Sequence, residues 1–393
     1  MLGKIGASLH NKLQKVKWGE YRIGDLFDKI EVKRLKYKVS ELPKTPIDNF
    51  VLPALTAGIQ NQGLNNYVPK KNATILKNVI SIASNGDAGA TFYQKNEFTI
   101  LQDAYAIKWK YNDNLLDDNN YLFLTNSISK SIYNKYDWTN KAGWNKVKEE
   151  KIQLPTKNGK IDFKFMTSFI AELEAEHIAE LEAYLLLTGL KDYVLTDKEK
   201  MILNDFIKGN LQKVKWGKYR IGDLFEMEKT LSFNKEKLVI GTQYDYITRT
   251  SQNQGILQEI GFVNKKNINP AGNWSCGLLQ MDFFYREKPW YAGQFVRKVN
   301  PKIQINKKST LYFTTIFNKL KKKLLSVSVK NVDKTFLNTE VNLPINKYGE
   351  IDFKFIEFFI SAIQKLIIKE VVLYTDRKIT AAKYIVNKDN NPK

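Results

Sequence analysis

The sequence predicts an α+β fold in which two globular mixed α/β bodies are joined by two long antiparallel packed helices and related by a pseudo-twofold internal repeat. Residues 13–27 and 211–225 share one opening motif, LQKVKWGEYRIGDLF in the first copy, and differ only where the second copy has Lys in place of Glu. The tetrapeptide QNQG at 60–63 returns at 252–255, displaced by 192 residues. A period near 190 residues is far longer than a solenoid repeat, so it indicates duplication of a whole domain.

A Leu-Pro closing motif ends each copy, at Leu154-Pro155 and Leu343-Pro344, and the sequence Ile-Asp-Phe-Lys-Phe follows both. Each copy therefore contains an opening motif, a variable body, a closing motif and an apolar helix. The predicted segments are an N-terminal helical segment at 1–14, a first body at 15–160, a first spacer helix at 161–190, a helical connector at 191–212, a second body at 213–350, a second spacer helix at 351–386 and a tail at 387–393.

The opening motif is expected to be a structural element, because it stays nearly identical while the bodies vary. Ile23, Leu26 and Phe27 have the spacing of a helical turn, as do their counterparts in the second copy. The bodies are expected to consist of short strands with one helix each. The predicted extended segments are 78–84, 90–93 and 98–109 in the first body, with a turn at 85–89, and 244–248, 277–285 and 294–299 in the second; the predicted helices are 121–136 and 311–325.

The segments after the closing motifs have apolar residues three and four positions apart, as amphipathic helices do. Asp162 and Asp352 are suited to cap them, and Thr196 with Glu199 forms a capping pattern at the start of the connector helix. A spacer of about 28 residues would extend roughly 42 Å. Two amphipathic helices of matching origin are expected to pack on each other, as in a coiled coil.

Composition favours a polyanionic partner. Sixty-two Lys and Arg residues against 41 Asp and Glu give a net charge of +21, which attracts nucleic acid. The alternative is that a Lys-rich and Asn-rich composition spreads solvated lysines over every face. The single cysteine, Cys276, cannot form an internal disulfide, the start lacks the features of a secretory signal, and no stretch of eighteen apolar residues occurs. We therefore expect a cytoplasmic protein that does not span a membrane.

The sequence contains none of the catalytic motifs that would fit such a partner. Its two histidines, His10 and His177, stand far from any cysteine that could share a zinc ion. It has no phosphate-binding Gly-rich Lys-Ser/Thr loop, no Gly-x-Ser-x-Gly elbow, no Asn-Pro-Pro-Tyr/Phe loop for a flipped adenine, and no acidic nuclease pattern. We expect no catalytic residue, no bound metal and no bound cofactor.

Side chains that could read DNA are more frequent in the bodies. Amides pair with adenine and Arg with guanine, while Lys and Tyr contact phosphates. The two QNQG turns are either ordinary polar turns or phosphate-positioning elements, and residues that read bases should differ between the copies. The candidate DNA-binding residues are Lys33, Arg34, Lys36, Gln60, Asn61, Gln62, Asn85, Asp87, Tyr93, Gln94, Lys95, Trp144 and Lys146 in the first body, and Arg249, Gln252, Asn253, Gln254, Asn273, Trp274, Tyr285, Arg286, Gln294, Arg297 and Lys298 in the second.

The chain resembles the specificity (S) subunits of Type I restriction-modification systems and of related bipartite Type II enzymes. The resemblance lies in the repeated sequence Trp-Gly-x-Tyr-x-Ile-Gly-Asp-Leu-Phe at 18–27 and 216–225, in the stretch Gly-Asp-Ala-Gly-Ala-Thr-Phe-Tyr at 86–93, and in the two amphipathic helices. It covers nearly the whole chain. The second copy departs from it, because it has no Gly-Asp-Ala-Gly sequence and offers Gly272-Asn273-Trp274 instead.

The resemblance implies that each body is a target recognition domain that reads one half of a split double-stranded DNA site in the major groove. The helices would set the gap between the half-sites and dock two methyltransferase (modification) subunits, and restriction subunits would join the larger complex. S-adenosylmethionine, ATP and Mg would then belong to the partner subunits. Two other hypotheses are a single-chain DNA-processing enzyme with an unrecognised nuclease site, and a scaffold that binds only proteins.

Overall fold

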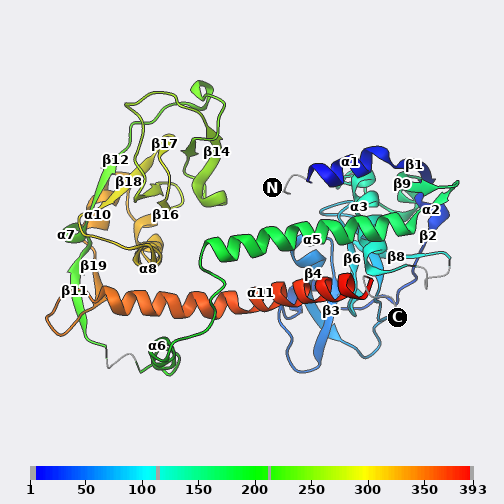
Figure 1. Cartoon of the computed structure of the whole chain (residues 1–393), viewed down its shortest axis with the longest axis horizontal. Coiled ribbons are helices and arrows are strands. Elements are labelled where there is room, and N and C mark those ends of the chain that lie inside the picture. Colours follow the sequence, from blue (N-terminus) through cyan, green and yellow to red (C-terminus); the bar gives the residue numbers. More distant parts are fainter. Residues whose placement is uncertain (1–5, 112–115, 211–213, 390–393) are drawn as a thin grey trace. The chain divides into compact units, whose positions relative to one another are not determined.

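The computed structural model describes residues 6–111, 116–210 and 214–389 and forms two compact units (Figure 1). The first unit comprises residues 1–183 and 378–393, and the second comprises residues 184–377. Of the predicted segments, only the spacers at 161–190 and 351–386 lie wholly within the described residues. The others each include positions outside them.

Three sheets in the first unit have counterparts in the second. The strands of the first unit are β1 (Lys17–Arg22), β2 (Phe27–Lys29), β3 (Phe50–Leu55), β4 (Leu64–Pro69), β5 (Val79–Ala83), β6 (Thr91–Gln94), β7 (Thr99–Ile100), β8 (Ala104–Trp109), β9 (Lys151–Lys157) and β10 (Lys160–Ile161). Those of the second are β11 (Trp216–Arg220), β12 (Phe225–Lys229), β13 (Tyr244–Ile247), β14 (Ile256–Ile260), β15 (Asn273–Gly277), β16 (Asp282–Arg286), β17 (Trp290–Ala292), β18 (Val296–Pro301) and β19 (Glu340–Pro344). The order β2-β8-β5-β6 matches β12-β18-β15-β16, β4-β3-β7 matches β14-β13-β17, and β1-β9-β10 corresponds to β11-β19.

Helices are distributed in a similar way. The first unit has α1 (Ala7–Lys15), α2 (Ile23–Leu26), α3 (Asp118–Ile132) and α4 (Trp144–Val147), and the second has α6 (Asp197–Ile207), α7 (Ile221–Leu224), α8 (Lys307–Lys319), α9 (Lys321–Leu325) and α10 (Val332–Leu337). Short 3-10 turns are η1 (Val39–Glu41), η2 (Gln60–Gly63), η5 (Lys235–Lys237), η6 (Gln252–Gly255) and η7 (Val329–Asn331). The long helices α5 (Phe163–Leu187) and α11 (Phe353–Asp389) each contribute residues to both units (Figure 1).

The opening and closing motifs of each copy pair with one another, which explains why both are repeated. β1 lies antiparallel to β9 with Trp18 opposite Pro155, and β11 lies antiparallel to β19 with Trp216 opposite Pro344. A Cβ atom on Gly19 would come within 2.7 Å of the Thr156 side chain, so the pairing requires glycine there. The structural role predicted for the opening motif is confirmed.

The helical turn of each opening motif then delivers an aromatic residue to the core. Phe27 and Phe225 are fully buried at the start of β2 and β12. In the first unit Phe27 packs edge-on against Trp109, and in the second Phe225 packs edge-on against Trp274 and Phe317. Each body therefore has its own aromatic core, as expected for a duplicated domain.

The strand pairings correct two expectations about the second body. The segment 277–285 is not one strand, because β15 ends at Gly277 and β16 begins at Asp282 after a tight turn. Gly272-Asn273-Trp274 is not the counterpart of the Gly86 turn. Asn273 pairs with Arg286 as Val79 pairs with Gln94, so Asn273 occupies the position at which β5 begins.

The helix caps are where the sequence predicts them. The carboxylates of Asp162 and Asp352 accept hydrogen bonds from the backbone N–H groups of Phe165 and Phe355, at 3.0 and 2.9 Å. The helix predicted at 121–136 is α3, which begins earlier at Asp118, and the one predicted at 311–325 is divided into α8 and α9. No helix in the described ranges is both long enough and apolar enough to traverse a lipid bilayer.

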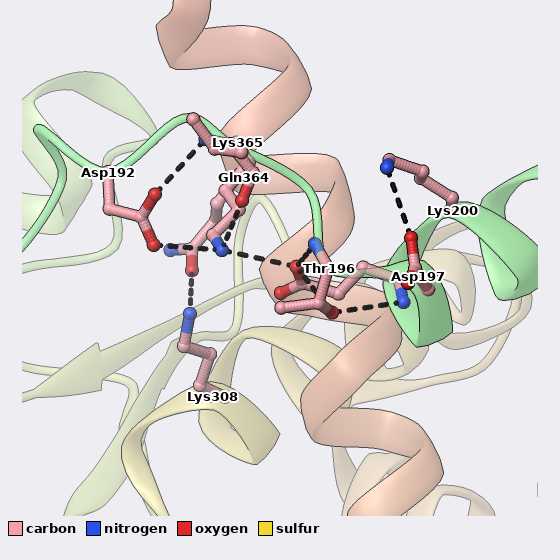
Figure 2. A network of polar contacts seen from close by, with 9 residues as sticks. Asp192, Thr196, Asp197, Lys200, Lys308, Gln364 and Lys365 are labelled. Atoms are coloured by element: carbon pink, nitrogen blue, oxygen red, sulfur yellow. Dashed lines mark hydrogen bonds and ion pairs between the residues drawn. The ribbon is translucent and has the colours of Figure 1, made fainter.

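The helix that precedes each opening motif forms an ion pair with the spacer helix of its own unit. In the first unit, Lys12 of α1 forms an ion pair with Glu172 of α5, and both side chains are nearly half exposed. In the second, Lys365 of α11 lies 2.9 Å from Asp192, which precedes α6 (Figure 2). Lys365 also lies 3.1 Å from Glu199 of α6. The Lys365 and Glu199 side chains are only 13% and 4% exposed. We call this second set of contacts the connector clasp.

Candidate nucleic-acid interface

The QNQG sequences form the same unusual turn in both bodies, which we call the amide turn. Asn61 and Gln62 have φ angles of 47° and 54°, and Asn253 and Gln254 have φ angles of 46° and 53°. Two consecutive non-glycine residues in this left-handed region are strained, and such strain is often found at functional sites. The same strained backbone in both copies makes the amide turn a candidate functional element.

Backbone hydrogen bonds close the amide turn in the same way in each copy. The N–H of Thr56 donates to the carbonyl of Gly63 at 3.0 Å, and the N–H of Thr248 donates to that of Gly255 at 2.8 Å. The side-chain amide of Asn253 also donates to the Ile256 carbonyl at 3.2 Å, and Asn61 makes the equivalent bond. The central Asn is thus partly used to hold the turn.

The outer glutamines are available for a partner. The residues Gln60, Gln62, Gln252 and Gln254 are exposed, and their side chains make no hydrogen bond within the part of the chain that the structure describes. Each carries a donor and an acceptor that could pair with a base edge or a phosphate. An exposed amide group on a strained, firmly bonded turn is a suitable contact for DNA.

Two further turns adjoin the amide turn in the first body. The Asp87 carboxylate accepts a hydrogen bond from the N–H of Ile59 at 3.2 Å, and the N–H of Asp87 donates to the Ala57 carbonyl at 3.1 Å. The N–H of Ser84 donates to the Asp103 carbonyl at 2.8 Å. Residues 56–63, 84–90 and 101–103 therefore form one turn cluster.

The second body has an equivalent turn cluster at 248–255, 278–281 and 293–295. The N–H of Leu278 donates to the Phe295 carbonyl at 2.9 Å, as Ser84 does to Asp103. The guanidinium of exposed Arg249 lies 5.4 Å from the centre of the Phe295 ring, within the range of a cation–π contact. Arg249 is thus held at the surface beside the amide turn, where it could reach the acceptors of guanine.

The two turn clusters, one in each body, contain ten of the predicted DNA-binding residues. All of them lie on the hydrogen-bonded turns described above, five in each body. These residues are Gln60, Asn61, Gln62, Asn85 and Asp87 in the first body and Arg249, Gln252, Asn253, Gln254 and Gln294 in the second.

Four predicted residues are not available at the surface, and this corrects the sequence-based assignment. Trp274 is fully buried in the second core, and Asn273 is 2% exposed, with its side-chain carbonyl oxygen accepting from the Trp290 indole at 3.0 Å. Gln94 and Arg286 are each 3% exposed. A buried side chain is not accessible to a ligand at the surface, so the structure assigns these four residues to the interior of the bodies.

Several other candidates are engaged by neighbouring side chains of their own unit. The Tyr93 hydroxyl donates to Asp118 at 2.7 Å, and Lys95 pairs with the same carboxylate. Burial first, and then the hydrogen bond to Asp118, raises the pKa of Tyr93, which keeps it protonated. In the second unit, Tyr285 packs on Trp274, Arg297 bonds Asp333 at 2.9 Å, and Lys298 pairs with Glu228 at 2.8 Å.

The remaining candidates in the first body lie outside the turn cluster. Lys33, Arg34 and Lys36 are exposed on the segment between β2 and η1 and form no ion pair with described residues. They are free to neutralise phosphates. Trp144 and Lys146 line a hollow of about 670 Å³ that is also lined by Asp28 and Glu31. Lys29 and Lys141 line it as well, so three lysines outnumber two carboxylates around the hollow.

One exposed amide of the turn cluster, Gln102, is absent from the DNA-binding residues predicted from the sequence. Gln102 is exposed at the position that corresponds to Gln294, because β7 and β17 end at the residues two before them. Its displacement from Gln294 is 192 residues, the same as that of the QNQG turns. A search for amides at this constant displacement would find it.

Within the described residues, no group of three or more His, Cys, Asp or Glu side chains is arranged to hold a metal ion. The one cysteine, Cys276, is fully buried in β15, and burial raises the pKa of its thiol. The exposed side chains of the turn clusters include amides, the Arg249 guanidinium and the carboxylates of Asp87 and Asp103. The chemistry they offer is hydrogen bonding and charge, as recognition of a nucleic acid requires.

Comparison with known proteins identifies relatives for both copies. The profile of the family described as the Type I restriction modification DNA specificity domain matches residues 15–183 and 213–373, once in each copy. The specificity subunit S.BcgI of a Type II restriction enzyme from Heyndrickxia coagulans is 24% identical over 170 residues, covering 43% of this chain and 47% of that protein. The match therefore spans about half the length of this curated relative.

A solved structure has a similar fold. The S subunit of a Type-I restriction-modification system from M. genitalium superposes with a TM-score of 0.53 and 14% identity, and the match covers 95% of both chains. The mixture of helices and strands and their order along the chain are thus shared with a specificity subunit over nearly the full length.

Proposed function

The chain belongs to the Type I restriction modification DNA specificity family, whose members are non-catalytic specificity subunits, and we propose that it recognises DNA sequence for a restriction-modification complex. Each body would read one half of a bipartite double-stranded site. The observation that carries this proposal is the pair of turn clusters, in which the same backbone geometry displays different side chains. A duplicated reader with two specificities needs this combination.

The side chains that differ are those expected to choose the bases. Arg249 and Phe295 in the second body occupy the positions of Ala57 and Asp103 in the first, on either side of the shared amide turn. Arg favours guanine, and an exposed aromatic ring favours stacking or contact with a thymine methyl group. The two halves of the site should therefore differ in sequence.

The long helices α5 and α11 are proposed to set the gap between the half-sites and to dock two methyltransferase subunits, with restriction subunits joining the larger complex. A chain with a pseudo-twofold repeat suits two copies of one partner. S-adenosylmethionine, ATP and Mg would be bound by those partners. The proposed compartment is the cytoplasm, which suits a chain with one buried thiol.

The experiment that tests this function is mapping of DNA methylation in cells that carry this chain with and without its modification subunit. We expect a split motif that appears only when both are present, and it would give both half-sites. No new motif, with both proteins soluble, would contradict the proposal. DNA cleavage by the purified chain with Mg²⁺ would instead support a single-chain enzyme, and a complex that never binds DNA would support a scaffold.

The spacing role has its own test. Removing seven residues from each of α5 and α11 shortens each helix by about 10.5 Å, which corresponds to about three base pairs. The gap in the methylated motif should shrink by that amount while the half-sites stay the same. An unchanged gap would show that the helices do not set the spacing.

A further inference from the structure

Behind each amide turn lies a buried polar side chain that differs between the two bodies. In the first body the Gln94 side-chain amide donates to the Gln62 carbonyl at 3.1 Å and to the Ser81 hydroxyl at 3.0 Å. In the second, the Arg286 guanidinium donates to the Gln254 carbonyl and to the Ser275 hydroxyl, the latter at 2.6 and 2.9 Å. The same carbonyl of the amide turn is the acceptor in both.

The sheet register shows that these are equivalent positions. Gln94 ends β6 opposite Val79, and Arg286 ends β16 opposite Asn273. Ser81 and Ser275 lie two residues further along the adjacent strands, so the serine is retained while its partner changes from an amide to a guanidinium. Two chemically different side chains therefore make one and the same connection.

Burying the Arg286 guanidinium in the second body costs free energy, which suggests that its hydrogen bonds have a functional role. Arg286 is 3% exposed, and no carboxylate pairs with it among the described residues. Burial lowers its pKa to about 10, although the charge of Asp245 opposes this, and Asp245 is itself paired with Lys288 at 2.9 Å. Burying a charge without an ionic partner is unfavourable unless its hydrogen bonds are satisfied.

The carbonyl that receives the bond belongs to a strained residue. Gln62 and Gln254 are the second of the two left-handed residues in each amide turn. Left-handed backbone at a residue other than Gly is disfavoured, so an unsupported turn would relax. A hydrogen bond from beneath the turn keeps the exposed side chains of Gln60 and Gln62, or Gln252 and Gln254, at fixed positions.

We propose that Gln94 and Arg286 are positioning residues, which do not contact DNA but hold the amide turns in the conformation that reads it. This inference rests on the proposed DNA-recognition function and deepens it. It assigns to two buried residues the role of fixing the geometry of each half-site reader. It also accounts for the retention of Ser81 and Ser275, which orient the donors.

The test uses two substitutions at one position, in the full chain expressed with its modification subunit. Arg286→Met keeps the length of the side chain but removes every donor, whereas Arg286→Gln restores the chemistry that the first body uses. We expect Arg286→Met to lower discrimination at the second half-site at least tenfold, and Arg286→Gln to retain most of it. The first half-site, read in the same methylation experiment, is the internal control for both.

Hydrogen exchange of the free chain supplies a readout that does not depend on DNA. The N–H of Thr248, which bonds Gly255 across the amide turn, should exchange at least tenfold faster in Arg286→Met and at nearly the wild-type rate in Arg286→Gln. The N–H of Thr56 in the first body should be unaffected by either.

The outcomes separate the two proposals. A wild-type chain that yields no split motif contradicts DNA recognition, and the positioning role falls with it. A split motif that Arg286→Met reads as well as wild type does overturns the positioning role alone. Equal loss of the second half-site in both variants would also overturn it, because the positive charge and not the hydrogen bond would then be what matters.

Discussion

The two units have the same strand order, but different kinds of side chain occupy equivalent positions in them. At three equivalent positions of the four-stranded sheet, the first unit has Tyr105, Ala106 and Gln94, whereas the second has Arg297, Lys298 and Arg286. The connector clasp repeats this difference, since its ion pair is buried and the Lys12–Glu172 pair of the first unit is not. The two units therefore share a backbone arrangement, but the second unit has charged side chains at sheet positions where the first unit has uncharged ones.

The largest effect should come from breaking the connector clasp. Lys365→Ala leaves the Glu199 carboxylate buried without its cation, and breaking a buried pair from one side costs about 3–5 kcal/mol. Lys12→Ala in the first unit should cost less than about 1 kcal/mol, because exposed pairs are screened by water. Hydrogen exchange resolved by unit measures both changes. Equal losses in the two units would show that burial of the pair does not explain the difference.

Lowering the pH should destabilise the connector clasp of the second unit. Burial raises the pKa of Glu199, but hydrogen bonds from Ser361, Thr196 and Lys365 outweigh it and lower the pKa from 4.5 to about 2. A carboxyl whose pKa is lower in the folded state stabilises the fold above its unfolded pKa. This stabilisation, on the order of 3 kcal/mol, is lost as the pH falls from about 4.5 to about 2. The connector of the second unit should therefore loosen over this range.

The control for the acid effect is Glu199→Gln, which cannot ionise. Its connector should exchange faster at neutral pH and show a flatter dependence on pH between about 4.5 and 2. Hydrogen exchange of residues 192–199 measures both variants. A wild-type connector as well protected at pH 2 as at pH 6 would contradict the assignment of the low pKa to a folded-state contact.

Replacing the glycine at the end of each amide turn with alanine should cause a smaller loss of stability, and the loss should differ between the two units. A Cβ on Gly63 would lie 2.8 Å from the Thr56 carbonyl oxygen, whereas one on Gly255 would meet nothing closer than 3.3 Å. Both positions have positive φ, which costs about 1 kcal/mol for alanine. Gly63→Ala should cost a further amount of about 1–3 kcal/mol from the clash, and Gly255→Ala little more than the strain alone.

Gly159→Ala is the matched control for those two variants. Its φ is +74°, and nothing lies within 4 Å of the position that a Cβ would occupy, so it reports backbone strain without a clash. Chemical denaturation monitored separately in each unit ranks the three. A Gly63→Ala variant no less stable than Gly159→Ala would show that the first turn can relax around the added methyl group.

How much of the fold could be predicted from the sequence depends on whether the signal is local. The caps at Asp162, Asp352 and Thr196 and the helical turn of the opening motif follow from short patterns, and the structure confirms them. The sequence merges β15 and β16 because the turn between them, at 278–281, contains Leu and Met and lacks the glycines of residues 86–89. A turn in which three of the four residues are apolar lacks the Gly, Pro, Asn and Asp residues that mark a turn in a sequence.

The turn cluster is predictable only in part for the same reason. The amide turns are evident because their residues are identical, and Arg249 because it stands close to one of them. Sequence patterns assign Gln94 and Arg286 to DNA because a polar residue on a strand carries no mark of the side that is buried. Only the pairing with Ser81 and Ser275, which needs the three-dimensional register, shows that they point inward.

The smallest effect is also the one that tests the comparison most directly, because here the two units are chemically identical. Asp162→Ala and Asp352→Ala each remove a cap that accepts from a backbone N–H at 3.0 or 2.9 Å, and each should destabilise its helix by about 1 kcal/mol. Asn at either position should retain most of the stability. If the units differ only in buried charge, the two losses measured by hydrogen exchange at the first turns of α5 and α11 should agree within about 0.5 kcal/mol. A larger gap would place the asymmetry in the backbone itself, and the sensitivity of the second unit to Lys365 and Arg286 would then need another explanation.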